Sequence, residues 1–386
     1  MLLQRIRRRG TAPLFGLLIV LPVVIAVTSA LTTAAAETAT HAPRTLTVLV
    51  DGGRDITVLE GFFPQNLRVR VGDTVTWKYN ADVTGGRHTV TFTGGPFPGL
   101  KEPLPTGGAG EVMPRRNIPV PGGDKDETMR NPLILFPTRQ DGAPIETYDG
   151  TTFATSGELS KRPRKGAPRK ETFSLTFTKP GLYRYICLEH HPHMIGTIEV
   201  VPATATDVPD QAQIDAQAKA EMDSLLAQIE TAKENAKTVR SQPGPNGTTT
   251  WYVQAGVFLS SEMRGMDFDF HPKNLTVKAG DTVIWQAKVT HTVTFTPSPP
   301  IPEPLISKPQ AEGMPLFIVN PKVARPTVPS GTYDPSQYYN SAQIGLNQQV
   351  RGTTWALTFD KPGVYEYVCA LHHEMGMKGT ITVVAR

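Results

Sequence analysis

Short runs in which apolar and polar residues alternate recur along most of the chain, and they predict β-strands. Apolar side chains alternate with polar ones from residue 67 to 77, on either side of Gly72-Asp73, and from 173 to 187, around Lys179-Pro180-Gly181. Alternation with a period of two puts one side of each strand into a core, and the Gly and Pro between the runs mark turns. Several such runs predict an all-β fold, either a sandwich or a barrel.

The same strings occur twice and in the same order, which indicates a duplicated domain. The matching segments are 66–77 with 274–285, 88–92 with 291–295, and 179–187 with 361–369. We therefore expect a first domain over residues 43–203 and a second over 248–386. Each domain has a long segment without clear alternation, at about 94–170 and 297–352, which we expect to be a loop.

Residues 207–241 have a different pattern, with apolar side chains three or four positions apart from Ile214 to Val239. This spacing places them on one face of an α-helix, which we expect to join the two domains. Pro209 suits the first turn, and Pro243-Gly244-Pro245 ends the helix. We expect the helix to rest on one domain rather than form a dimeric coiled coil, because the apolar face is short and half alanine.

The first 36 residues differ from the rest of the chain in charge. Arg5, Arg7, Arg8 and Arg9 precede a stretch without charge from Gly10 to Ala36. A basic, then apolar, then small-residue order predicts a secretory signal peptide over residues 1–36, cleaved near Ala36, and the alternative is a retained membrane anchor. We therefore expect a periplasmic or extracellular protein that contacts a membrane only through this segment. Without it the chain has 35 basic and 35 acidic residues, so its charge predicts no nucleic-acid partner.

Histidine, cysteine and methionine are concentrated at matching places in the two repeats. Each repeat has an early histidine and a late segment with Cys, His and Met; these residues are His88, Cys187, His190 and Met194, and then His291, Cys369, His372, Met375 and Met377. A thiolate, two imidazoles and a thioether suit copper in a trigonal plane with a long axial Met, whereas zinc more often takes further Cys or His, or a carboxylate and water. A Cys187–Cys369 disulfide would leave the duplicated histidines unexplained.

These motifs resemble those of the type 1 blue copper, or cupredoxin, family of plastocyanin, pseudoazurin and amicyanin. The resemblance covers the Gly-Asp-Thr-Val-x-Trp strand, the His-Thr-Val-Thr-Phe strand and the Tyr-x-Cys-x-x-His to Met-x-Gly segment of each repeat. It implies two tandem Greek-key β-sandwiches joined by the helix, with two copper ions per chain. The implied ligands are His88, Cys187, His190 and Met194, and His291, Cys369, His372 and Met377.

The axial ligands are less well defined than the others. We prefer Met377 over Met375 because its Met-x-Gly context repeats that of Met194. His193 has no counterpart in the second repeat, and it could compete with Met194 and give a harder site.

The resemblance implies an exported electron carrier that exchanges electrons with redox proteins. A copper storage or delivery protein is the alternative, because it would use the same ligands. An oxidase or a nitrite reductase-like enzyme is disfavoured, since such enzymes bind further copper through His-x-His pairs and a histidine directly before the Cys. In this chain the residues directly before the two cysteines are Ile186 and Val368. The sequence predicts neither the redox partner nor the oligomeric state.

Overall fold

The computed structural model describes most of the chain that follows residue 40. The described residues are 41–80, 86–94, 116–139, 144–161, 169–190, 193–259, 264–310, 315–327, 330–345 and 353–386. The predicted signal peptide, residues 1–36, lies outside them. Within these ranges, no helix combines the length and hydrophobicity needed to cross a membrane.

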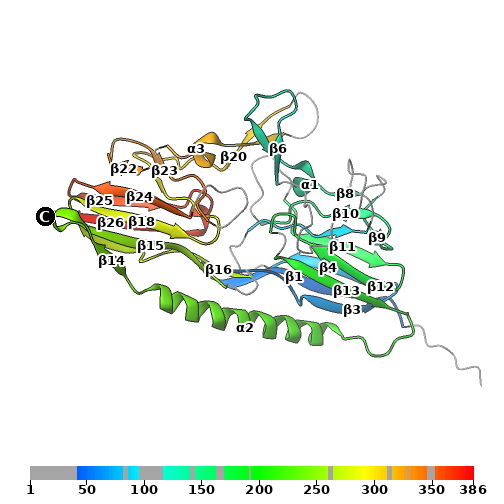
Figure 1. Ribbon diagram of the computed structural model, residues 1–386. Helices are drawn as coiled ribbons and strands as arrows, with labels where there is room; N and C mark the ends of the chain where they lie inside the picture. The colour runs from blue at the N-terminus through cyan, green and yellow to red at the C-terminus, as the bar shows by residue number, and fades with distance from the viewer. Residues whose placement is uncertain are drawn as a thin grey trace, which may run out of the picture. The chain divides into compact units, whose positions relative to one another are not determined.

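The first half of the described chain forms strands of two β-sheets (Figure 1). One has the order β2-β1-β4-β11-β9, with the strands Thr57–Phe63, Thr45–Arg54, Thr74–Tyr79, Thr172–Phe177 and Thr147–Tyr148. The other has the order β3-β13-β12-β5-β10-β8, with the strands Asn66–Arg70, Ile195–Val201, Gly181–Ile186, Thr91–Thr93, Phe153–Thr155 and Thr138–Arg139. Side chains from both sheets share one hydrophobic core.

The second half repeats this strand order. Its first set is β16-β15-β18-β24-β22, with the strands Gly265–His271, Thr249–Phe258, Asp281–Ala287, Thr354–Phe359 and Ser330–Thr332, and with β14 (Arg240–Pro243) beside β15. Its second is β17-β26-β25-β19-β23, with the strands Asn274–Lys278, Lys378–Val384, Gly363–Val368, Thr294–Phe295 and Tyr339–Asn340. Two 3-10 turns, η1 (Pro245–Gly247) and η2 (His373–Met375), complete this half. The described chain is thus mostly β-sheet, as the alternation predicts.

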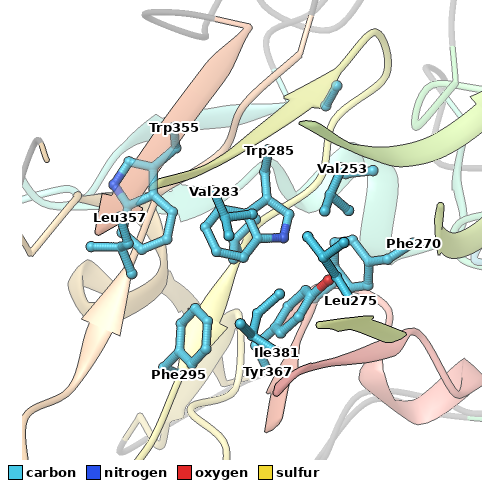
Figure 2. Close-up of a cluster of buried hydrophobic side chains, with 14 of the residues drawn as sticks. Val253, Phe270, Leu275, Val283, Trp285, Phe295, Trp355, Leu357, Tyr367 and Ile381 are labelled. Atoms are coloured by element: carbon cyan, nitrogen blue, oxygen red, sulfur yellow. The ribbon is translucent and has the colours of Figure 1, made fainter. Parts of the chain in front are cut away.

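Each core contains a fully buried tryptophan from the strand that follows the Gly-Asp turn. The ring centroids of Trp77 and Tyr185 lie 5.1 Å apart, and those of Trp285 and Tyr367 lie 5.3 Å apart. Both pairs meet edge to face, an arrangement that adds roughly 0.5–1.5 kcal/mol to the stabilisation from burial. Figure 2 shows Trp285 surrounded by Val253, Val283, Phe295 and Tyr367.

The helix α2 (Gln211–Ala236) begins with a capping box, in which the Asp210 carboxylate accepts a hydrogen bond from the Gln213 amide at 2.9 Å. This helix is shorter than the predicted segment 207–241. Its buried residues are Ile214, Ala218, Leu225 and Ile229. Ile214 joins the core of the first half, and the other three pack in a cluster that includes Leu59, Phe63, Val257 and Leu259. The helix therefore contacts strands of both halves, and our expectation that it rests on one domain was wrong.

The two halves are joined along one sheet edge, because β2 pairs antiparallel with β16. Leu59 lies opposite Gly265, and Thr57 lies opposite Asp267. The pairing makes one 11-stranded sheet that runs through both halves. This long-range contact explains why α2 has strands of both halves beneath it.

The two segments expected to be loops contain short strands and one-turn helices. Besides β8, β9 and β10 in the first and β22 and β23 in the second, these are β6 (Asn117–Pro119), β7 (Thr128–Arg130) and α1 (Pro132–Leu135) in the first, and β20 (Leu305–Lys308), β21 (Leu316–Val319) and α3 (Pro321–Ala324) in the second. Strand β7 pairs with β21, where Met129 lies opposite Ile318 and both are buried. An Asn-Pro pair begins each short helix, at Asn131 and Asn320. This repeated helix-start signal was missed in the sequence.

Candidate metal centres

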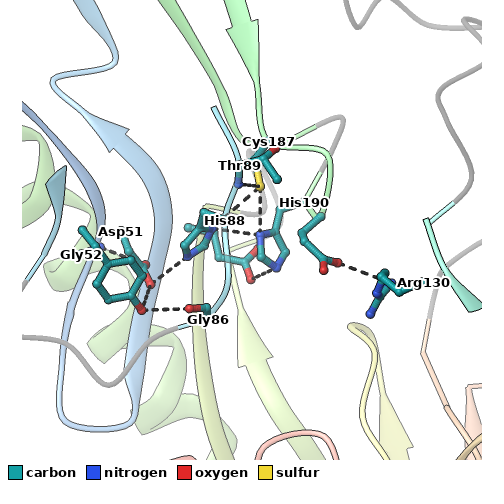
Figure 3. A network of polar contacts seen from close by, with 11 residues as sticks. Asp51, Gly52, Gly86, His88, Thr89, Arg130, Cys187 and His190 are labelled. Atoms are coloured by element: carbon teal, nitrogen blue, oxygen red, sulfur yellow. Dashed lines mark hydrogen bonds and ion pairs between the residues drawn. The ribbon is translucent and has the colours of Figure 1, made fainter. Parts of the chain in front are cut away.

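The first cluster brings together His88, Cys187 and His190 (Figure 3). The Sγ atom of Cys187 lies 3.9 Å from Nδ1 of His88 and 3.5 Å from Nδ1 of His190, and the two nitrogens are 3.1 Å apart. Cys187 and His88 are fully buried, while His190 is partly exposed. The three donor atoms therefore face one point close to the protein surface.

Neighbouring strands hold these ligands in place. His88 precedes β5, Cys187 follows β12, and β5 and β12 are paired. The segment after Cys187 folds back on itself, because the Cys187 amide donates to the Met194 carbonyl at 2.9 Å and the Met194 amide donates to the His190 carbonyl at 3.1 Å. The Thr89 amide also donates to the Cys187 sulfur at 3.3 Å. The ligand geometry is thus fixed by main-chain hydrogen bonds.

The second cluster, His291, Cys369 and His372, has nearly the same geometry. Its Sγ atom lies 3.8 Å and 3.3 Å from the two Nδ1 atoms, which are again 3.1 Å apart. The Thr292 amide donates to the Cys369 sulfur at 3.3 Å, as Thr89 does to Cys187. The two halves thus position the same three ligand types in the same way.

Met194 and Met377 occupy equivalent places. Both side chains are fully buried, and each main-chain carbonyl accepts a hydrogen bond from the cysteine amide of its own cluster, at 2.9 Å and 3.1 Å. Met375 lies in the turn η2 and is only partly buried. His193 is partly buried and does not belong to the cluster of donor atoms around Cys187. The equivalence supports Met194 and Met377 as the axial candidates.

The electrostatic environment favours neutral imidazole, the form that binds metals, at three of the four histidines. Burial lowers the pKa values of His190 and His291, and burial together with Arg87 lowers the pKa of His372 to about 3. Burial alone would lower the pKa of His88. The Asp51 carboxylate outweighs this effect, so the pKa of His88 lies well above its usual value.

The surroundings of the two clusters differ. In the first, Nε2 of His88 lies 3.0 Å from a carboxylate oxygen of Asp51, and Nε2 of His190 lies 3.2 Å from one of Glu60. In the second, Nε2 of His291 is buried without a hydrogen-bond partner, and the His372 ring stacks on Phe268 with centroids 4.2 Å apart. Asp51 and Glu60 were not predicted from the sequence, because they lie on early strands outside the repeated motifs.

The donor set of each cluster fits copper better than zinc. Two imidazole nitrogens and one thiolate sulfur converge, a buried thioether stands nearby, and no carboxylate belongs to either group of donor atoms. Each pair of Nδ1 atoms is held 3.1 Å apart with the sulfur alongside, an arrangement that a bound cation satisfies.

Comparisons with known proteins agree with this chemistry. Residues 257–384 match the family model described as copper binding proteins of the plastocyanin/azurin family. Plastocyanin of Scenedesmus fuscus is 28% identical over 118 residues, which are 30% of this chain and 85% of that protein. Among solved structures, oxidised plastocyanin from Dryopteris crassirhizoma matches with 20% identity, 34% of this chain, 99% of that chain and a TM-score of 0.19. An oxidised amicyanin mutant matches with 20% identity, 29% of this chain, 70% of that chain and a TM-score of 0.16. Residues 257–384, in the second half of this chain, are therefore similar to the copper-binding domain of the plastocyanin/azurin family.

Proposed function

We propose that the protein is an exported electron carrier that binds one copper ion in each half and exchanges electrons with redox proteins. The observation that carries this proposal is the pair of matching clusters, whose sulfur–nitrogen distances differ by 0.2 Å or less between the halves. Such agreement supports two metal sites of the same kind rather than one metal site and one that has lost its function.

The frame around each cluster suits a centre that changes oxidation state without moving its ligands. The cysteine sulfur accepts a main-chain amide hydrogen bond in both halves, and the cysteine amide itself is bonded to the methionine carbonyl. When bound, copper supplies a one-electron couple, Cu(I) to Cu(II), for which this ligand type is suited. The partly exposed His190 and His372 give each centre an edge near solvent, where a redox partner can approach.

Metal content and colour test the proposal directly. We expect the copper-loaded protein to hold two copper ions per chain and to show the visible band of a Cu(II)–thiolate bond. Cys187→Ala and Cys369→Ala should each remove about half of the copper and of the band, because each deletes one thiolate. His193→Ala, which changes a nearby side chain outside the cluster, is the matched control and should keep both ions.

A second measurement separates the carrier from a storage or delivery protein. Repeated reduction and reoxidation in the presence of a copper chelator should leave the copper bound. Loss of copper at each reduction would favour delivery, and a Cys variant that keeps both ions would contradict the assignment of independent centres.

A further inference from the structure

The two halves carry different residues at one equivalent position of their first strand. A β-bulge shifts the register between β1 and β2 and again between β15 and β16, and the residues opposite the two bulges are Asp51 in β1 and Gly256 in β15. Both have left-handed backbone angles, with φ values of 72° and 70°. The backbone is therefore the same at this point, and only the first half places a side chain there.

That side chain reaches a predicted copper ligand. The Asp51 carboxylate lies 3.0 Å from Nε2 of His88, and both residues are completely buried (Figure 3). In the second half a side chain has no room, because a Cβ atom on Gly256 would lie 2.3 Å from Nε2 of His291. The buried His291 nitrogen consequently stays without a partner.

The other ligand histidine of each half shows the same contrast. Val50 pairs with Phe62 of β2, and Ala255 pairs with Phe270 of β16. Glu60 and Phe268 each lie two residues before these phenylalanines, so they occupy equivalent positions. Glu60 meets His190 at 3.2 Å, whereas Phe268 covers the His372 ring. Among the described residues, the first centre thus has a carboxyl group beside each histidine, whereas Gly256 and Phe268 stand at the equivalent positions of the second. Burial raises the pKa of Glu60 to about 8, so Asp51 is the charged partner of the two.

Arginines lie near both centres, because Arg116 and Arg130 act on His190 and Arg87 acts on His372. Arg130 lies 3.6 Å from Glu189, and Arg87 lies 3.4 Å from Glu158. Arg130 and Arg87 therefore also pair with carboxylates, whereas Asp51 and Glu60 lie within hydrogen-bond distance of the ligand rings themselves.

A carboxylate bonded to the outer nitrogen of a metal-ligating histidine fixes the orientation of the ring and increases its basicity as a ligand. A negative charge in a buried site also stabilises the more highly charged ion more strongly, because the surrounding dielectric is low. Both effects favour Cu(II) over Cu(I). A histidine packed only on an aromatic ring and a glycine receives neither effect.

We propose that Asp51 is a positioning residue that gives the first centre a lower reduction potential than the second. The proposal rests on the proposed function, since it requires copper at both centres. It assigns the two centres different roles, with the first holding Cu(II) more strongly and the second accepting an electron more readily.

Single-centre proteins make the comparison measurable. Cys369→Ala leaves the thiolate band to the first centre, and Cys187→Ala leaves it to the second, so spectroelectrochemical titration of each gives one potential. We expect the lower value in Cys369→Ala. Adding Asp51→Asn to Cys369→Ala should weaken Cu(II) binding about tenfold, as is usual when such a partner is lost. If Cu(I) binding is unchanged, the potential rises by about 59 mV.

Two further variants keep the result interpretable. Asp149→Asn removes one negative charge from the same half, at an exposed pair with Lys179, and should leave the potential unchanged. Asp51→Gly places opposite the bulge the residue of the second half, which adopts this backbone without strain, and it replaces Asp51→Asn if that variant fails to fold.

The outcomes separate the two proposals. Equal potentials in the two single-centre proteins, or an Asp51→Asn potential equal to that of Asp149→Asn, would overturn the role of Asp51 while leaving the carrier proposal intact. A wild-type chain that takes up no copper would overturn both.

Discussion

In the first half each predicted histidine ligand has a carboxyl group on its far side, whereas in the second half the corresponding neighbours are a glycine and a phenylalanine. The ligands themselves lie at nearly the same distances, 3.9 and 3.5 Å against 3.8 and 3.3 Å from the sulfur. The main-chain hydrogen bonds that fix the cysteines are also repeated. The strand pairing and the folded-back loop therefore build the cluster in both halves, while the residues behind the histidines differ.

The largest effect is expected where the two halves tolerate a side chain differently. Gly256→Ala would place a Cβ atom 2.3 Å from Nε2 of His291, so the imidazole must move away from its place beside Cys369. We expect the second centre to lose its copper, which leaves one ion per chain by metal analysis.

The matched control for this variant is Asp51→Ala, because that position already holds a side chain and the first centre should keep its copper. If Gly256→Ala keeps two copper ions, His291 can shift without losing the metal. The steric difference between the halves would then not affect copper binding.

An intermediate effect is expected at a position where the two halves make the same hydrogen bonds. The buried Asp73 carboxylate accepts hydrogen bonds from the Arg44 and Arg70 amides at 2.9 and 3.0 Å. Asp281 accepts the equivalent pair from Thr249 and Lys278, both at 2.9 Å. Replacing either aspartate by alanine leaves buried donors without partners, which costs roughly 1–3 kcal/mol. Denaturant unfolding should show this loss of stability in each variant.

Asp281 should be the more costly of the two to replace, because it also accepts a hydrogen bond from the Trp251 indole at 3.0 Å. The control is Asp149→Ala, which breaks an exposed ion pair worth at most about 1 kcal/mol. If Asp73→Ala and Asp281→Ala were no more destabilising than this control, the Gly-Asp turn would not be an anchor of the fold.

The sequence was sufficient for features that depend on local spacing. The strand alternation, the repeat and the positions of Cys187 and Cys369 relative to their histidines all lie within short motifs, so their interpretation needs no knowledge of the tertiary fold. The pairing of β2 with β16 has no such signal, since the strands are about 200 residues apart in the chain. The placement of α2 on both halves follows from that pairing, and it was therefore missed.

The carboxyl groups behind the first centre were missed for a related reason. Asp51 contacts His88 from the point of β1 that lies opposite a bulge in β2, and Glu60 contacts His190 from that bulge. A sequence pattern assigns inward and outward faces by simple alternation, which a bulge interrupts. The strands inside the two long segments were missed because they have only two to four residues, too few for a periodic pattern to be recognised.

The smallest effect is expected at the axial position, because a methionine in this place is a long, weak ligand. Met377→Leu and Met194→Leu should each keep copper bound, since leucine conserves the volume of the buried side chain, but the visible band and the potential of the affected centre should shift. Met375→Leu is the matched control within the same loop. The Met375 side chain is only partly buried, and its amide donates a hydrogen bond to the His372 carbonyl at 3.0 Å. The Met377 carbonyl instead accepts a hydrogen bond from the Cys369 amide at 3.1 Å, as the Met194 carbonyl does from the Cys187 amide. A band that shifts in Met375→Leu and stays in Met377→Leu would reverse the assignment, and the two loops would then hold their axial ligands at different points of the fold.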